Sequence, residues 1–219
     1  MSTHDSAPQS SDVCSSSGEA TRDCSAEATA LPRDAAELAG RLTLSDGVAL
    51  YQRAIRADDA THLQAFHKRL SHQSILFRFF GEVPELSVAF AERLSHVDYD
   101  TRMAVVVNVG AGADEPIIAV ARYQRLDQES AEIGLAVEDD WQGRGLGPRL
   151  MRTLAAYGRG RGILTFIAYV MIDNSHMLAM LRHSGFPTTF SFREGRVVAR
   201  LDISGAGMLY PESGERPHA

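Results

Sequence analysis

Cysteine is nearly absent from this chain of 219 residues, which holds only Cys14 and Cys24. Neither cysteine lies near a histidine cluster with the spacing of zinc ligands. One pair is also too few for the disulfide framework of a small secreted protein. We therefore expect no metal site and no scaffold of disulfide bonds.

A surplus of positive charge is also lacking. The formal net charge is −6, and residues 1 to 45 account for most of it, with seven acids against three bases. The rest of the chain is close to neutral, whereas a nucleic-acid-binding protein needs a strongly basic face. We therefore expect no nucleic-acid partner.

Long hydrophobic runs are missing as well. The longest candidate is the ten-residue segment from Ile163 to Ile172, and a membrane helix needs about 18 apolar residues. The first ten residues carry no basic group followed by an apolar run, so they resemble neither a secretory signal nor a transit peptide. We expect a cytoplasmic protein without a membrane partner.

The composition predicts one folded domain between two tails. Hydrophobic residues make up 44% of the chain, enough for a buried core. Residues 1–30 contain no Leu, Ile, Phe, Tyr or Trp and cannot offset the entropy of ordering. We expect a disordered acidic tail at 1–40, a folded domain at 41–205 and a flexible tail at 206–219.

Apolar periodicity and turn residues predict the elements of the domain. A short helix at 34–37 precedes a hairpin at 41–55 that turns at Ser45-Asp46-Gly47, and Asp58 or Asp59 caps the next helix. The order of strands and helices predicts an α/β domain of α+β style, with a mixed, mostly antiparallel sheet flanked by helices. The expected helices are 59–70, 72–80, 85–94, 146–157 and 175–184, and the later strands are 103–109, 117–125, 129–137, 163–171, 188–193 and 196–203.

A glycine-rich loop from Gln142 to Gly147 links a predicted strand to the helix at 146–157. Glycines allow close approach to a ligand, and the free N–H groups of a helix N-terminus stabilise a pyrophosphate. The loop therefore predicts a phosphate-bearing ligand, with a tight turn that binds nothing as the alternative. It lacks the GxxxxGK pattern of nucleotide-triphosphate loops and the third glycine and distant acid of dinucleotide sites.

The same loop matches the Q/R-x-x-G-x-G/A motif of the GNAT superfamily of acyl-CoA-dependent N-acyltransferases. More narrowly, the chain resembles bacterial Pat-type protein lysine acetyltransferases over residues 43 to 203. The segments that carry this resemblance are RLSHQSILFRFFG (69–81), LSHVDYDTRMAVVV (94–107), AEIGLAVEDDWQGRGLG (131–147) and DNSHMLAMLRHSGF (173–186).

The resemblance implies a GNAT-like fold that binds acetyl-CoA as cosubstrate. It implies that Asn174 lies beside the pantetheine arm and that Glu132 is the catalytic general base. A solvent-exposed edge acid is the alternative for Glu132. No tyrosine occurs between Asn174 and Phe186 to act as general acid, so the group that protonates the thiolate is not assigned. The implied cofactor-binding residues are Leu135, Ala136 and Val137 for the arm, and Gln142, Gly143, Arg144, Gly145, Leu146 and Gly147 for the pyrophosphate.

Three functions follow from these residues and the resemblance. The leading interpretation is an acetyltransferase for protein lysine side chains, with an acyl-CoA synthetase among the protein partners that the resemblance suggests. The second is an acetyltransferase for a small-molecule amine, and the third is a noncatalytic acyl-CoA sensor. Incubation with labelled acetyl-CoA and a lysate distinguishes the three. Label in protein favours the first function, label in small molecules the second, and label in neither the third.

Overall fold

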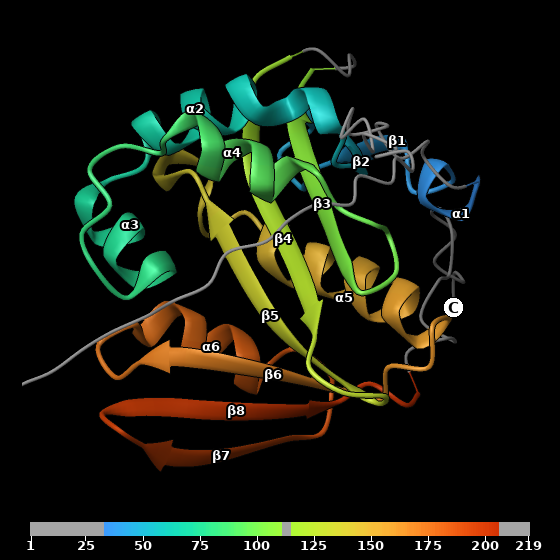
Figure 1. Cartoon of the computed structure of the whole chain (residues 1–219), viewed down its shortest axis with the longest axis vertical. Coiled ribbons are helices and arrows are strands. Elements are labelled where there is room, and N and C mark those ends of the chain that lie inside the picture. Colours follow the sequence, from blue (N-terminus) through green and yellow to red (C-terminus); the bar gives the residue numbers. More distant parts are fainter. Residues whose placement is uncertain (1–32, 111–114, 206–219) are drawn as a thin grey trace, which may run out of the picture.

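The structure, a computed structural model, describes residues 33–110 and 115–205 (Figure 1). Residues 1–32 of the expected N-terminal tail and the expected tail at 206–219 lie outside the described residues. Within the described part, no helix is long and apolar enough to cross a membrane. The elements are α1 (Arg33–Ala36), β1 (Gly40–Thr43), β2 (Ala49–Ala54), η1 (Ala57–Asp59), α2 (Ala60–Arg69), α3 (His72–Phe79), α4 (Val88–Ser95), β3 (Arg102–Val109), β4 (Ile117–Arg125), β5 (Ser130–Val137), η2 (Asp139–Trp141), α5 (Leu146–Arg159), β6 (Thr165–Met171), α6 (Ser175–Arg182), β7 (Thr188–Arg193) and β8 (Arg196–Asp202).

Eight strands form one sheet in the order β1-β2-β3-β4-β5-β6-β8-β7. Neighbouring strands are antiparallel, except that β5 and β6 run parallel. The predicted fold class is thereby confirmed. Some predicted ends are wrong by two or three residues. Helix α4 begins after Ser87, whose hydroxyl caps it by accepting from the N–H of Phe90, and β6 begins after a turn in which the N–H of Ile163 donates to Gly158.

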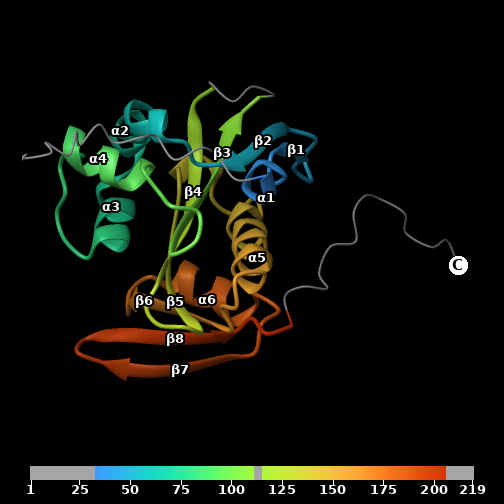
Figure 2. The same ribbon diagram turned by 45° about the vertical axis from the view of Figure 1, so that its right-hand side comes forward.

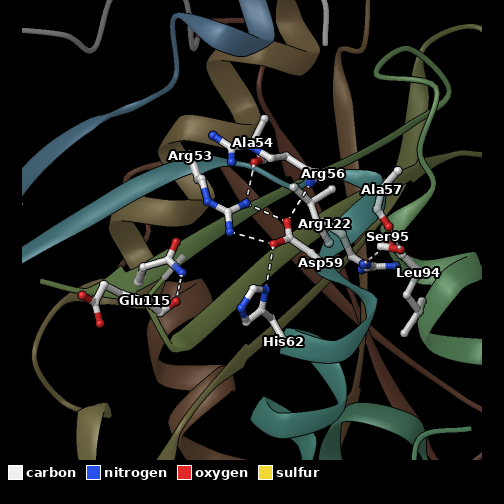
Figure 3. Close-up of polar contacts among 12 residues, drawn as sticks. Arg53, Ala54, Arg56, Ala57, Asp59, His62, Leu94, Ser95, Glu115 and Arg122 are labelled. Atoms are coloured by element: carbon white, nitrogen blue, oxygen red, sulfur yellow. Dashed lines mark hydrogen bonds and ion pairs between the residues drawn. The ribbon is translucent and has the colours of Figure 1, made fainter. Parts of the chain in front are cut away.

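The first hairpin turns where the sequence predicts. The carboxylate of Asp46 accepts from the N–H of Val48, and Gly47 has a φ of 86° that favours glycine. Of the two predicted caps, Asp59 is the N-cap residue of α2, but its side chain makes no capping bond to the helix. Asp59 instead binds Arg53 through two contacts of 2.6 and 2.7 Å, and both side chains are buried (Figure 3). This charge pair fixes β2 to the start of α2.

Helices cover the central strands on both faces. Figure 2 shows α5 on one side of β3, β4 and β5, with α2, α3 and α4 on the other. The stripe of α5 that includes Leu150 and Leu154 is buried, and Leu63 and Phe66 of α2 are buried on the opposite side. A two-faced core of this kind holds β5 rigidly between its helices.

Strands β5 and β6 separate soon after they meet. Their parallel pairing covers Ser130, Ala131 and Glu132 of β5, whereas β5 continues to Val137. Figure 1 shows the two arrows diverging, with α6 beside β6. The N–H and C=O groups of successive residues in a strand point to opposite neighbours. The N–H of Glu138 donates to Ile118 of β4, so the groups of Glu138 point toward β4. The N–H and C=O groups of Leu135 and Val137 therefore face the gap between β5 and β6.

Candidate functional site

The glycine loop follows β5 and leads directly into α5. Gly143 and Gly145 have φ values of 73° and 83°, a conformation that side chains disfavour. Gly145 is the N-cap of α5, and no side chain caps the helix or places an acid in its first turn. Leu146 is buried and anchors the helix start in the core. The first N–H groups of α5 therefore remain suited to an anion.

Gly147 has a different role from the other two glycines. A Cβ atom at this position would lie 2.8 Å from Sδ of Met180 in α6 and 3.2 Å from Cδ2 of Leu135 in β5. Both distances are shorter than ordinary van der Waals contact. Side chains of the protein thus fill the space on the Cβ side of Gly147, and the glycine lets α5, α6 and β5 pack closely.

Hydrogen bonds join the loop to the start of α3. The Nε2 group of Gln142 donates to the carbonyl of Val137 at 3.1 Å and to Oγ of Ser74 at 3.2 Å. Asp139 accepts from the N–H and hydroxyl of Ser71 at 2.9 and 2.7 Å, and from the hydroxyl of Ser74 at 2.9 Å. Partial burial raises the pKa of Asp139, but these hydrogen bonds bring the net pKa below its usual value. The loop and α3 therefore form one connected unit.

Arg144 contacts Trp141 and the first hairpin turn. Its guanidinium lies 4.8 Å from the ring centre of Trp141, and its Nη1 is 3.5 Å from Oδ2 of Asp46 in the first hairpin turn. The structure thus places Arg144 between Trp141 and the turn that joins β1 to β2.

Asn174 lies at the start of α6. Its Oδ1 accepts from the N–H of Met177 at 3.0 Å and caps the helix. This bond occupies the carbonyl end of the amide and leaves the Nδ2 group as a hydrogen-bond donor.

Glu132 is exposed on β5, at the last residue that pairs with β6. Its side chain projects from the same face as Gly134 and Ala136, toward α3. The Arg78 guanidinium lies over Gly134, where a Cβ atom would be 2.9 Å from its Cζ. Burial lowers the pKa of Arg78, and the neighbouring Glu132 carboxylate raises it in part. A carboxylate and a guanidinium therefore face each other where the gap begins.

Glu132, the Leu135–Val137 backbone and the loop from Gln142 to Gly147 follow one another along β5 and into the start of α5. Arg78 and Arg122 also contact this region, and neither was predicted from the sequence. The available signal was a single charge inside an apolar segment, Phe77-Arg78-Phe79 on α3 and Ala121-Arg122-Tyr123 on β4. Within residues 33–110 and 115–205, no cluster of three or more His, Cys, Asp or Glu side chains could hold a metal ion.

Comparisons with curated proteins identify relatives. An acetyltransferase of Pseudomonas aeruginosa is 34% identical over 121 residues, which are 55% of this chain and 65% of that protein. Acetyltransferase Pat of Mycolicibacterium smegmatis is 36% identical over 112 residues, which are 50% of this chain and 33% of that protein. The chain thus spans less than two thirds of either relative.

Solved structures show the same architecture. The GNAT domain of S. lividans PAT superposes with a TM-score of 0.70 at 31% identity, covering 76% of this chain and 98% of that one. The cAMP-binding acyltransferase from Mycobacterium smegmatis gives a TM-score of 0.56 at 27% identity, covering 80% of this chain and 50% of that one. The acetyltransferase (GNAT) family matches residues 72–186, more than half of the sequence. The chain therefore belongs to the acetyltransferase (GNAT) family.

Proposed function

We propose that this acetyltransferase moves an acetyl group from acetyl-CoA to lysine side chains of proteins, with Glu132 as general base. The observation that carries the proposal is the place of Glu132, an exposed carboxylate where β5 and β6 separate. The resemblance to Pat-type protein lysine acetyltransferases supports a protein substrate. An acyl-CoA synthetase is the class of target that we propose first.

The groups around the gap fit acetyl-CoA. The amide groups of Leu135 and Val137 face the gap and can bond the pantetheine arm as a neighbouring strand would. The free N–H groups at the start of α5 suit the pyrophosphate, and Arg144 supplies a cation beside it. We place Asn174 on the opposite wall, with its Nδ2 group available to the arm. A backbone N–H near Leu135 would polarise the thioester carbonyl.

The chemistry needs a base because lysine is protonated near neutral pH. With a pKa of about 10.4, roughly one amine in a thousand is neutral at pH 7.4, which corresponds to about 4 kcal/mol. In our proposal Glu132 removes a proton from the amine, directly or through water. The nitrogen attacks the carbonyl carbon, a C–N bond forms, the C–S bond breaks, and the CoA thiolate takes up a proton.

Replacing Glu132 by Gln keeps the shape of the side chain and removes the base. We expect kcat to fall by about 10²-fold or more with acetyl-CoA affinity nearly unchanged. The difference in kcat between wild type and variant should shrink as the pH rises toward the lysine pKa, because more of the acceptor amine is then already neutral. Initial rates on a lysine peptide and calorimetry with CoA measure both quantities.

Glu129→Gln is the matched control, since Glu129 is an exposed acid just before β5. It should retain wild-type kcat. Unchanged turnover in Glu132→Gln near neutral pH would remove Glu132 from the mechanism. Incubation of the wild-type protein with labelled acetyl-CoA and a cell lysate tests the substrate: label in small molecules would contradict a protein acceptor, and label in neither fraction would contradict catalysis.

A further inference from the structure

A small cavity lies on the Glu132 face of the sheet, between β4, β5 and the helices α2, α3 and α4. Its volume is about 40 Å³, room for a few water molecules or one small functional group. Most of the lining is apolar and comes from α2, α4 and the two strands. These residues include Leu63, Phe66, Leu86, Leu94, Val120 and Ala136.

Two arginines line this apolar cavity, and among residues 33–110 and 115–205 one of them, Arg122, has no carboxylate partner. The Nη2 group of Arg122 donates to the carbonyl of Leu94 at 2.9 Å, as Figure 3 shows beside Ser95. Burial lowers the pKa of Arg122 to about 9, and the charged groups that act on it, Arg78 and Arg102, are both cations. A neutral carbonyl is a poor substitute for an anion at a guanidinium that is partly removed from water.

Both arginine side chains lie on the same face of the sheet, close to Gly134 of β5 in register or in space. Arg122 and Gly134 are direct partners across β4 and β5, so the Arg122 side chain projects from the same face as Gly134. The guanidinium of Arg78 lies over Gly134 and also lines the cavity. The carboxylate of Glu132, exposed on β5, partly offsets the positive charge of Arg78. Arg122 lines the cavity as well, and within the described part of the chain no such carboxylate acts on it. The cavity therefore has more positive than negative charge.

We propose that this cavity binds the terminal carboxylate of a short dicarboxylic acyl group, so that the protein transfers acyl groups such as malonyl or succinyl as well as acetyl. The inference rests on the proposed function, because it places the thioester at the gap beside Leu135. Ala136 is the next residue of β5 and forms part of the cavity wall. An acyl chain that enters the cavity past Ala136 would bring its carboxylate toward Arg122 and Arg78.

The transfer step has the same balance as for acetyl. The amine nitrogen bonds to the carbonyl carbon, the C–S bond breaks, the amine loses one proton to the base, and the CoA thiolate gains one. The distal carboxylate stays ionised and appears unchanged in the amide product. It serves only as the group that the two arginines recognise through charge-assisted hydrogen bonds.

The test compares two donors of similar length that differ in terminal charge, succinyl-CoA and pentanoyl-CoA, on one lysine peptide. We expect the wild-type kcat/KM to favour succinyl-CoA by at least about tenfold, the range for a hydrogen bond to a charged group. Arg122→Met should abolish or reverse this preference. Arg33→Met removes a cation of exposed α1 that pairs with Glu37 and is not among the groups that act on Arg122, and it should keep the preference.

Each outcome is decisive. Equal rates with both donors in a wild-type protein that transfers acetyl would overturn the carboxylate site and leave the proposed function intact. A preference for succinyl-CoA that survives Arg122→Met would also overturn the carboxylate site. So would a preference that appears only when the acceptor peptide carries an acidic residue. If Arg122→Met fails to fold, Ala136→Val tests the same space, since filling the cavity should reduce succinyl transfer more than acetyl transfer. No transfer from any donor would contradict the proposed function itself.

Discussion

Gly147 offers a direct test of how α5, α6 and β5 are packed. The perturbation is Gly147→Ala, which adds one Cβ atom 2.8 Å from Sδ of Met180 and 3.2 Å from Cδ2 of Leu135. Overpacking of this kind costs about 1–3 kcal/mol, whereas alanine in a helix gains about 0.5–1 kcal/mol over glycine. We expect a net loss of about 1–2 kcal/mol in the free energy of unfolding.

Gly145→Ala is the matched comparison two residues earlier. No atom lies within 4 Å of a Cβ at Gly145, but its φ of 83° strains any side chain by about 1–2 kcal/mol. The two variants therefore lose similar stability for different reasons. Met180→Ala should recover part of the loss in Gly147→Ala by making room, and should recover none in Gly145→Ala.

Urea denaturation of the single and double variants gives the coupling between positions 147 and 180. The packing argument would be refuted if Gly147→Ala were as stable as the wild type, or if Met180→Ala lowered the stability of both glycine variants equally. Either result would return Gly147 to a role in ligand approach alone.

Two further predictions concern buried and bridging carboxylates. Asp59→Asn should destabilise the fold by about 3–5 kcal/mol, because it leaves buried Arg53 without its anion. The control is Glu37→Gln in the exposed pair with Arg33, which should cost less than about 0.5 kcal/mol. Thermal and chemical denaturation compare the two variants. Asp139→Asn should weaken the contact between the loop and α3 at pH 7. The Asp139 pKa is lowered in the fold, so its carboxylate contributes to the stability of the protein above about pH 4. This contribution is lost as the pH falls through the lowered pKa. Denaturation midpoints of wild type and Asp139→Asn that stay equally far apart down to pH 2 would contradict this.

Local patterns were sufficient for most elements of the fold. The stripe of Leu150 and Leu154 predicted α5, and the apolar runs predicted β3, β4 and β5, because burial on one or both faces imposes a period that the sequence must carry. The resemblance to the GNAT superfamily is confirmed by the family match at residues 72–186. The order of elements therefore needed no long-range information.

Contacts between distant residues were beyond such patterns. Asp59 precedes a helix and has the chemistry of a cap, but Arg53 provides a stronger tertiary partner. Asp139 bonds to Ser71 across 68 positions of sequence, and no local period relates the two. The role of Gly147 likewise depends on Met180 of another helix. The assigned roles of Glu132 and Asn174 stay predictions until their variants are measured.

The gap between β5 and β6 also bears on aggregation. An unpaired strand edge is a place where a foreign extended chain can add and start a fibre. Here the edge from Ile133 to Val137 spans about 16 Å, at about 3.3 Å per residue, and it lies within the sheet rather than at its border. Pairing of Glu132 with Ile167 blocks one end, and Gln142 covers the carbonyl of Val137 at the other. A long intruding strand cannot lie along so short a slot, so the protein can keep backbone groups open for a narrow ligand without offering a template for self-association.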